Sequence, residues 1–201
     1  MGFCKSGLGC FFSMDAFLIS TGIVALAEMG DKTQLLALVL AARYQRPWPI
    51  VLGIFVATIA NHAMAGALGA WLTTLLSPQA LRWILGASFI AMALWMLIPD
   101  KLDDDDSDGK VPRLGVFGTT VFVFFLAEMG DKTQIATVML AARYSAYFWV
   151  VAGTTLGIML ANAPVVWLGS RMTQRIPLRA VHIVSALIFA VLGALALWVP
   201  A

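Results

Sequence analysis

Four acidic residues lie deep inside two long apolar stretches of the chain. Residues 26–34 read Leu-Ala-Glu-Met-Gly-Asp-Lys-Thr-Gln, and residues 126–134 repeat the same nine residues. The acidic positions of the two copies are Glu28, Asp31, Glu128 and Asp131. A charged side chain at the centre of a bilayer costs roughly 2.5–3.5 kcal/mol even on a lenient insertion scale. If these stretches cross a membrane, the carboxylates must face one another, a cation or water.

Other oxygen-bearing side chains accompany these carboxylates. Glu28 and Asp31 are three residues apart, which predicts that both project from one face of a helix. Gly30 and Gly130 permit either close helix approach or local unwinding, and unwinding would free backbone carbonyls as ligands. Hard divalent cations such as Ca²⁺, Mn²⁺ and Mg²⁺ prefer such oxygen ligands. The additional candidate ligands are Thr33, Thr133, Gln34, Gln134, Asn61 and Asn162.

The charge balance of the two motifs also favours a divalent cation. Four carboxylates contribute −4 and the neighbouring Lys32 and Lys132 contribute +2, which leaves −2. Without a metal, such a site would take up protons, because crowded carboxylates in a low dielectric repel one another. Metal entry would then release protons. The sequence therefore offers a physical basis for exchanging a cation for protons.

Simpler interpretations of these polar residues stay open. The glutamate and lysine of each motif are four residues apart, so they could form only a structural ion pair. That interpretation leaves both aspartates unexplained. Asn61 and Asn162 could hydrogen-bond between helices. We expect His62 to be a helix-packing or pore-facing residue rather than a ligand, and His182 to lie at the membrane interface.

The composition places the motifs in a membrane protein. Of 201 residues, 61% are apolar and 12% charged, against roughly 45–50% and about 25% in soluble domains. This excludes a soluble enzyme and a nucleic-acid-binding module. Six apolar stretches are each long enough to cross about 30 Å of hydrocarbon as a helix: 14–42, 49–76, 81–98, 114–142, 147–170 and 180–199. We therefore predict an all-α membrane protein with six transmembrane helices.

The two motif copies, offset by 100 residues, divide the chain into two halves of three spans. Because three is odd, the second half enters the membrane from the opposite side. We therefore predict two inverted three-helix repeats, an arrangement typical of secondary transporters with a site near the membrane midplane. Residues 14–99 form the first repeat, 100–113 an acidic cytoplasmic linker, and 114–200 the second repeat.

Basic residues in the loops predict the orientation. One side of the membrane carries both termini and three basic residues: Lys5, Arg82 and Arg143. The other side carries eight: Arg43, Arg46, Lys101, Lys110, Arg113, Arg171, Arg175 and Arg179. Both termini are thus expected outside the cytoplasm. We interpret the acidic run 103–106 as a solvated linker, or else as a cation-collecting or regulatory loop. Cys4 and Cys10 could pair outside the cell or stay free.

Two copies of Glu-x-Gly-Asp-Lys-Thr in a six-span chain of 201 residues resemble a known family. It is the manganese/calcium cation-exchanger family, which includes Golgi proteins tied to glycosylation defects and bacterial manganese exporters. The short loops make the chain most similar to the bacterial members. The resemblance implies export of Mn²⁺, or of Ca²⁺, from the cytoplasm across the bacterial inner membrane in exchange for protons. It also implies that Glu28, Asp31, Glu128 and Asp131 bind the cation.

Other functions are less compatible with the residues. A divalent-cation channel is the alternative, since it would share an acidic ring at the midplane. A membrane enzyme is disfavoured because the chain contains neither His-Glu-x-x-His nor Gly-x-Ser-x-Gly. We expect no cofactor beyond the transported ion, and as partners the metal ion, protons and the lipid bilayer. Both motifs lie in one chain, so a monomer would suffice, and a dimer is possible.

Overall fold

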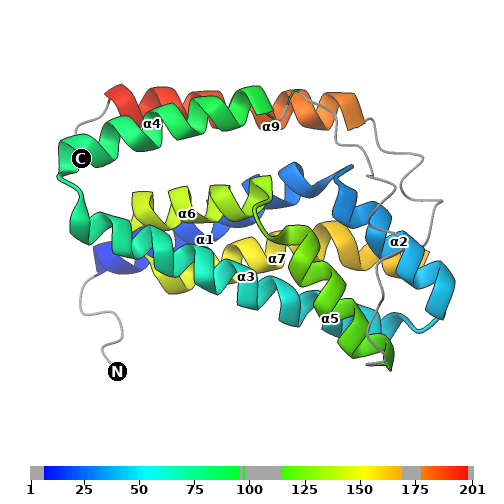
Figure 1. The fold of residues 1–201 in the computed structure, drawn as a ribbon. Coiled ribbons are helices and arrows are strands. Elements are labelled where there is room, and N and C mark those ends of the chain that lie inside the picture. The colour runs from blue at the N-terminus through cyan, green and yellow to red at the C-terminus, as the bar shows by residue number, and fades with distance from the viewer. Residues whose placement is uncertain (1–6, 96, 98–114, 169–177, 199–201) are drawn as a thin grey trace.

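The computed structural model describes residues 7–95, 97, 115–168 and 178–198, which form eight α-helices (Figure 1). The helices of the first half are α1 (Gly7–Glu28), α2 (Lys32–Tyr44), α3 (Pro47–Leu75) and α4 (Pro78–Trp95). Those of the second half are α5 (Gly115–Glu128), α6 (Lys132–Tyr144), α7 (Tyr147–Leu168) and α9 (Leu178–Trp198). The all-α prediction is confirmed. The acidic linker 100–113 and Cys4 lie outside the described residues, as do the side chains of Cys10 and His182.

The first and fourth predicted spans are each interrupted near their middle. Of the two alternatives left open at the motif glycines, the structure has local unwinding, so each of the spans 14–42 and 114–142 consists of two helices. Gly30 and Gly130 have φ angles of 85° and 77°, a left-handed conformation that only glycine adopts without steric cost. Glu28 ends α1, whereas Asp31 is the N-cap residue of α2. The two acidic residues thus lie on opposite sides of a helix break, and not on one face of a helix.

A glutamine side chain satisfies the backbone at each break. Gly30 donates its N–H to Gln34 Oε1 at 3.0 Å, and Gly130 donates to Gln134 Oε1 at 2.6 Å. Inside a membrane an unpaired N–H would cost several kcal/mol, and the glutamine side chain supplies the acceptor that a helix break there would need. The identical spacing of glycine and glutamine in both motifs explains why the same break forms twice.

Each helix of the second half runs opposite to its counterpart in the first half (Figure 1). Helix α5 continues into α6 in the direction opposite to that of α1 and α2, and the same holds for α7 with α3 and for α9 with α4. The closest packing joins the halves: α1 packs on α7, and α3 packs on α5 and α6. At Gly153 in α7, a Cβ atom would lie 2.5 Å from the carbonyl oxygen of Phe17 in α1. Only glycine permits this approach.

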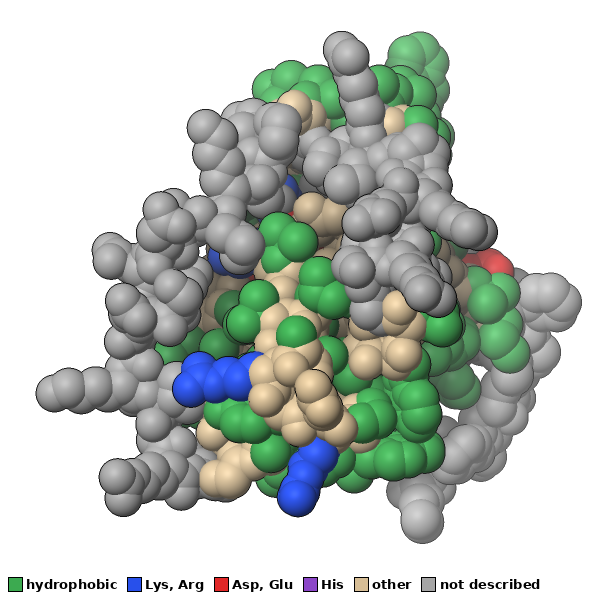
Figure 2. All heavy atoms as spheres, turned by 90° about the vertical axis from the view of Figure 1, so that its right-hand side faces the viewer, with side chains coloured by type: hydrophobic (Ala, Val, Ile, Leu, Met, Phe, Trp, Pro, Cys, Tyr) green, Lys and Arg blue, Asp and Glu red, His purple; other side chains and the backbone are tan. Residues whose placement is uncertain are grey.

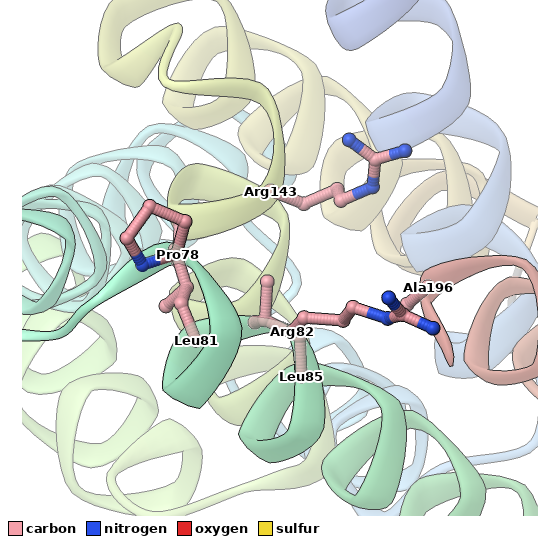
Figure 3. Close-up of a pocket in the computed structure, with 7 residues that line it drawn as sticks. Pro78, Leu81, Arg82, Leu85, Arg143 and Ala196 are labelled. Carbon is pink, nitrogen blue, oxygen red and sulfur yellow. The ribbon is translucent and has the colours of Figure 1, made fainter. Parts of the chain in front are cut away.

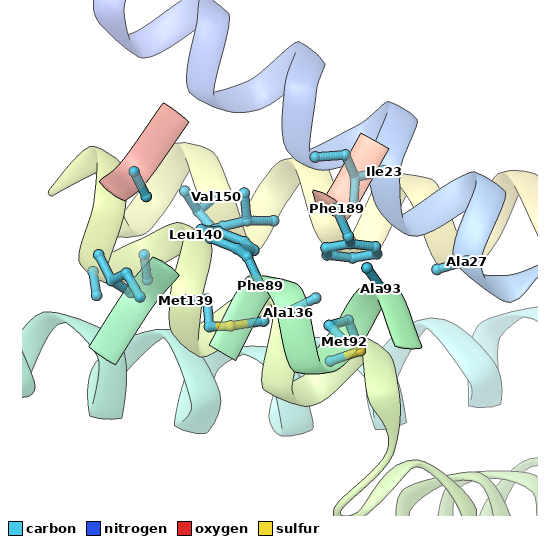
Figure 4. Packing of buried hydrophobic residues seen from close by; sticks show 14 of the residues in the cluster. Ile23, Ala27, Phe89, Met92, Ala93, Ala136, Met139, Leu140, Val150 and Phe189 are labelled. Atoms are coloured by element: carbon cyan, nitrogen blue, oxygen red, sulfur yellow. The ribbon is translucent and has the colours of Figure 1, made fainter. Parts of the chain in front are cut away.

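Helices α4 and α9 form a separate antiparallel pair that covers one side of the bundle (Figure 1). Phe89 of α4 and Phe189 of α9 are fully buried, with ring centroids 6.2 Å apart. They pack with Met92, Ile23 and Leu140 in a hydrophobic cluster that joins the pair to α1 and α6 (Figure 4). The outer pair is therefore seated on the helices that carry the motifs.

The surface of the molecule is apolar around the bundle. Large hydrophobic side chains are exposed on all eight described helices, which marks a surface that contacts lipid or protein. Basic side chains project from the end of the bundle seen in Figure 2, with hydrophobic side chains beside them. Two described helices, α3 and α7, are each long and apolar enough to cross a membrane alone, and α5 and residues 183–198 are shorter apolar helices.

We predict that replacing Gly130 with alanine destabilises the protein. Nothing lies within 4 Å of an added Cβ, so the cost is the left-handed backbone alone, about 1–2 kcal/mol. This corresponds to a lowering of the melting temperature in detergent by roughly 2–8 °C for a chain of this size. Gly22→Ala is the matched control, because that position also has open space but lies in helix α1. Equal melting temperatures for both variants would contradict the prediction.

Candidate metal centre

The four acidic residues of the motifs meet at the two helix breaks. Glu28 and Glu128 are completely buried, and Asp31 and Asp131 are 2% and 5% exposed. Oxygen atoms of Glu28, Asp31 and Asp131 all lie within 4.8 Å of one another. This set combines residues from both halves of the chain. Glu128 is buried nearby but does not belong to the same cluster of oxygens.

The lysine of each motif forms an ion pair with the aspartate of the other motif. Lys32 Nζ lies 3.7 Å from Asp131 Oδ1, and Lys132 Nζ lies 3.8 Å from Asp31 Oδ1. The simpler interpretation from the sequence placed an ion pair inside each motif, between its own glutamate and lysine. The reciprocal pairs found here connect the two halves, so each motif supplies the counter-charge for the other.

Glu28 receives two hydrogen bonds on one of its oxygens. The Thr33 hydroxyl donates to Oε2 at 2.5 Å, and the Asn162 amide nitrogen donates to the same atom at 3.4 Å. The other oxygen, Oε1, is buried and has no hydrogen-bond partner among the described residues. Leaving such an acceptor unpaired costs roughly 1–3 kcal/mol, and more when it is charged. Glu28 thus keeps one oxygen for a further ligand.

Glu128 is held by a residue that the sequence analysis did not single out. Thr58 of α3 donates its hydroxyl to Glu128 Oε1 at 3.0 Å, and Glu128 Oε2 lacks a hydrogen-bond partner in the described part of the chain. Thr58 precedes Asn61 by three residues, which places both on one helix face. That spacing was the available signal.

The amide side chains predicted as possible ligands hold the breaks against neighbouring helices. Gln34 Nε2 donates to the backbone oxygen of Ala161 in α7 at 3.0 Å. Asn61 Nδ2 donates to the backbone oxygen of Phe125 in α5 at 3.0 Å, and its Oδ1 atom lies 3.5 Å from Gln134 Nε2. These groups position the breaks. Thr133 lies closer to the carboxylates, with its hydroxyl 3.4 Å from Asp131 Oδ2.

His62 is buried and faces α6. The Thr137 hydroxyl donates to the backbone oxygen of Thr133 at 2.8 Å and lies 3.0 Å from His62 Nδ1. Because the Thr137 hydroxyl gives its one proton to Thr133, His62 Nδ1 is the donor in the contact with Thr137 and carries a proton. His62 therefore links α3 to α6 one turn beyond the motif, in agreement with a packing role.

The two sides of the cluster differ in exposure. The Lys32 side chain is 33% exposed, whereas that of Lys132 is 4% exposed. Trp95, the last residue of α4, lies over Lys132 with its ring centroid 6.0 Å from Nζ, at the outer limit of a cation–π contact. The site is thus covered on the Lys132 side and more open on the Lys32 side.

A buried group of carboxylate oxygens at helix breaks, in an all-helical protein with an apolar surface, defines a membrane protein suited to bind cations. Residues 16–104 and 116–200 match the family described as divalent cation/proton antiporter GDT1. The chain therefore belongs to this family of membrane transport proteins, as the resemblance of the motifs implied.

Several curated proteins are similar to the chain. It is 51% identical over 177 residues to a "putative manganese exporter" of Vibrio cholerae, covering 88% of this chain and 87% of that protein. It is 29% identical over 202 residues to a GDT1-like protein of Synechocystis, covering 92% and 98%. A GDT1-like protein of Oryza sativa is 27% identical over 212 residues, covering 94% and 74%. No solved structure matches the chain.

We predict that Lys132→Gln lowers stability more than Lys32→Gln. Removing one partner of a buried ion pair lowers the free energy of unfolding by roughly 3–5 kcal/mol, whereas a more exposed pair contributes far less to it. Melting temperatures in detergent measure the difference. The double variant Asp31→Asn/Lys132→Gln removes both charges and is expected to recover part of the loss. Equal effects of the two lysine variants would argue against the observed difference in burial.

Proposed function

We propose that the protein exports Mn²⁺ from the bacterial cytoplasm across the inner membrane in exchange for protons. Glu28, Asp31 and Asp131 bind the ion, and Glu128 completes the acidic site. The observation that carries the proposal is the cluster of three buried carboxylates, contributed by both halves, within 4.8 Å of one another. Six spans in two inverted repeats, residues 14–99 and 114–200, would place this site near the midplane with both termini outside the cytoplasm.

The charge of the site supports a divalent ion. Two lysines pair with two of the four carboxylates, so the remaining −2 matches one divalent cation. The buried oxygens of Glu28 and Glu128 that lack hydrogen-bond partners in the described structure are available to such an ion. Binding would relieve both the mutual repulsion of the carboxylates and their missing hydrogen bonds.

Proton exchange follows from the same charges. When the metal leaves, the −2 must be compensated in another way, because an uncompensated charge inside a membrane is costly. Protons bound to carboxylates supply that compensation, and returning metal displaces them. Metal and protons thus compete for one site, which couples their movement in opposite directions. Export is then driven by the proton gradient.

Alternating access is supported by the opposed directions of counterpart helices and by the unequal cover of the site. In this structure Lys132 is covered by Trp95, while Lys32 is more exposed. Two inverted halves that exchange conformations expose a central site to each side in turn. After the exchange, Glu128 would occupy the position in the cluster that Glu28 holds here. Asn162 and its counterpart Asn61 would then exchange surroundings as well.

The preference for Mn²⁺ is supported by the oxygen-only site and by the description of the Vibrio cholerae relative as a manganese exporter. Carboxylates suit Mn²⁺, Ca²⁺ and Mg²⁺ better than ions that favour sulfur or imidazole. Ca²⁺ is the second candidate. No cofactor and no enzymatic reaction is part of the proposal, and one chain contains the complete site.

We predict that Asp31→Asn abolishes transport by purified protein in liposomes that enclose a pH-sensitive dye. In the unchanged protein, Mn²⁺ added on one side should drive proton movement in the opposite direction. Ca²⁺ is tested separately under the same conditions. The matched control is Asp15→Asn, an exposed acidic residue in α1, which should retain full transport. Full activity of a well-folded Asp31→Asn variant would refute the site.

A different result would favour a channel. If Mn²⁺ crosses at the same rate without any proton movement, and no concentrative uptake follows an imposed pH gradient, the exchange mechanism is wrong while the acidic site stands.

We predict that Glu28→Gln weakens Mn²⁺ binding at equilibrium more than Glu128→Gln. Only Glu28 shares the compact oxygen cluster with both aspartates in this conformation. A loss of one carboxylate ligand should lower the affinity at least tenfold, whereas Glu128→Gln should lower it less while still blocking turnover. Electron paramagnetic resonance of free Mn²⁺ measures the binding. Equal losses of affinity would indicate that both glutamates bind the ion in one conformation.

A further inference from the structure

A second polar feature lies at one end of the bundle, apart from the acidic site. A small cavity of about 50 Å³ is bounded by α4, α6 and α9 (Figure 3). Arg82 of α4 and Arg143 at the end of α6 contribute the polar part of its wall, and the rest of the lining is apolar, with Leu81, Leu85 and Ala196 among its residues. The two arginine side chains, which line one cavity, extend in the same direction in Figure 3.

The two arginines have no negative partner in the described structure. No acidic side chain lines the cavity, and the ion pairs of the described residues involve Lys32 and Lys132 instead. Arg82 donates from Nη2 to the backbone oxygen of Leu197 in α9, but its Nε atom is buried without a hydrogen-bond partner. Two like charges that line one cavity repel each other, and a buried guanidinium donor without an acceptor is costly. An oxyanion would correct both, because guanidinium groups bind it through paired hydrogen bonds.

The level of the cavity in the membrane indicates the source of that oxyanion. Exposed tryptophans lie close to lining residues in the sequence: Trp83 follows Arg82, and Trp198 lies two residues after Ala196, with exposures of 57% and 85%. Phe148 and Trp149 begin the helix after Arg143 and are also exposed. Exposed aromatic residues at the ends of membrane helices lie at the level of the lipid headgroups. The arginines therefore lie where phospholipid phosphates are concentrated.

We propose that Arg82 and Arg143 bind the phosphate of an anionic phospholipid, such as phosphatidylglycerol. The apolar part of the cavity wall, with Leu81 and Leu85, accepts the adjoining glycerol and acyl region. Because Arg82 belongs to α4 and Arg143 to α6, the bound phosphate joins the outer α4–α9 pair to a helix that carries the acidic motif. The same α4 ends at Trp95 over Lys132, so the lipid also fixes the helix that covers the metal site.

The test compares lipid binding by the full chain and by the double variant Arg82→Gln/Arg143→Gln. Native mass spectrometry of protein titrated with phosphatidylglycerol in detergent measures the bound lipid, and melting temperatures measure the stabilisation it gives. We expect the double variant to bind at least tenfold more weakly and to lose the stabilisation. Arg143→Gln alone, at an exposed position, should show part of the loss with the fold unchanged.

Arg43→Gln is the matched control. Arg43 precedes Arg143 by 100 residues and lies in the last turn of α2, as Arg143 does in α6. Its guanidinium carbon lies 5.6 Å from the centre of the Tyr44 ring, and it does not line the cavity. It should retain binding. Equal losses from Arg43→Gln and from the double variant would show only general attraction to charged lipid and would overturn the proposal.

The source of the phosphate is tested in the same assay. If inorganic phosphate at the lipid's concentration stabilises the protein as much as phosphatidylglycerol, the site binds a soluble anion and the lipid assignment is wrong. If the zwitterionic lipid phosphatidylcholine binds as tightly as phosphatidylglycerol, and the double variant leaves the binding of both lipids unchanged, the arginines do not recognise phosphate. These readouts do not depend on transport, so they can fail or succeed independently of the proposed exchange of Mn²⁺ and protons.

Discussion

The compensation of buried negative charge at two helix breaks is the constraint on which the structure depends. Glu28 and Glu128 are completely buried at the ends of α1 and α5, where the helix dipoles also point their negative ends. Asp31 and Asp131 begin the next helices, whose positive ends favour them. The lysines of the opposite motifs supply further positive charge. The breaks therefore distribute the carboxylates between helix ends of opposite polarity and leave a net negative site for a cation.

This compensation makes the two halves of the chain interdependent. Each aspartate is paired with the lysine of the other half, and Glu28 and Glu128 receive hydrogen bonds from Asn162 and Thr58 of helices in the opposite half. Neither half alone would satisfy its own buried charges. The close packing of α1 on α7 and of α3 on α5 also joins the two halves, and it brings these hydrogen-bond donors to the glutamates. Any movement of one half relative to the other would therefore disturb these ion pairs and hydrogen bonds together.

The sequence predicted the all-helical fold, the acidic motifs and most helix bounds, because hydrophobic stretches and identical repeats are local signals. It did not decide between helix approach and local unwinding at Gly30, since glycine allows both and the choice depends on an acceptor four residues later. It likewise missed Thr58, whose role depends on the packing of α3 against α5. The amides of Gln34 and Asn61 were predicted as possible ligands, but their hydrogen bonds to Ala161 and Phe125 depend on helix positions that no pattern encodes.

The side chains of the site also determine which ions it could bind. Histidine and cysteine would favour zinc or copper, which bind most ligands more tightly than manganese does. In the described cluster the possible metal ligands that carry charge are carboxylates, and the buried His62 directs Nδ1 to Thr137 in α6. A site of oxygen ligands gives little advantage to the softer ions. Because the lysines neutralise part of the negative charge, the electrostatic attraction for a divalent ion would be weaker than that of four unpaired carboxylates. A transporter must release its ion on the other side of the membrane, so a weaker attraction would suit turnover better than very tight binding.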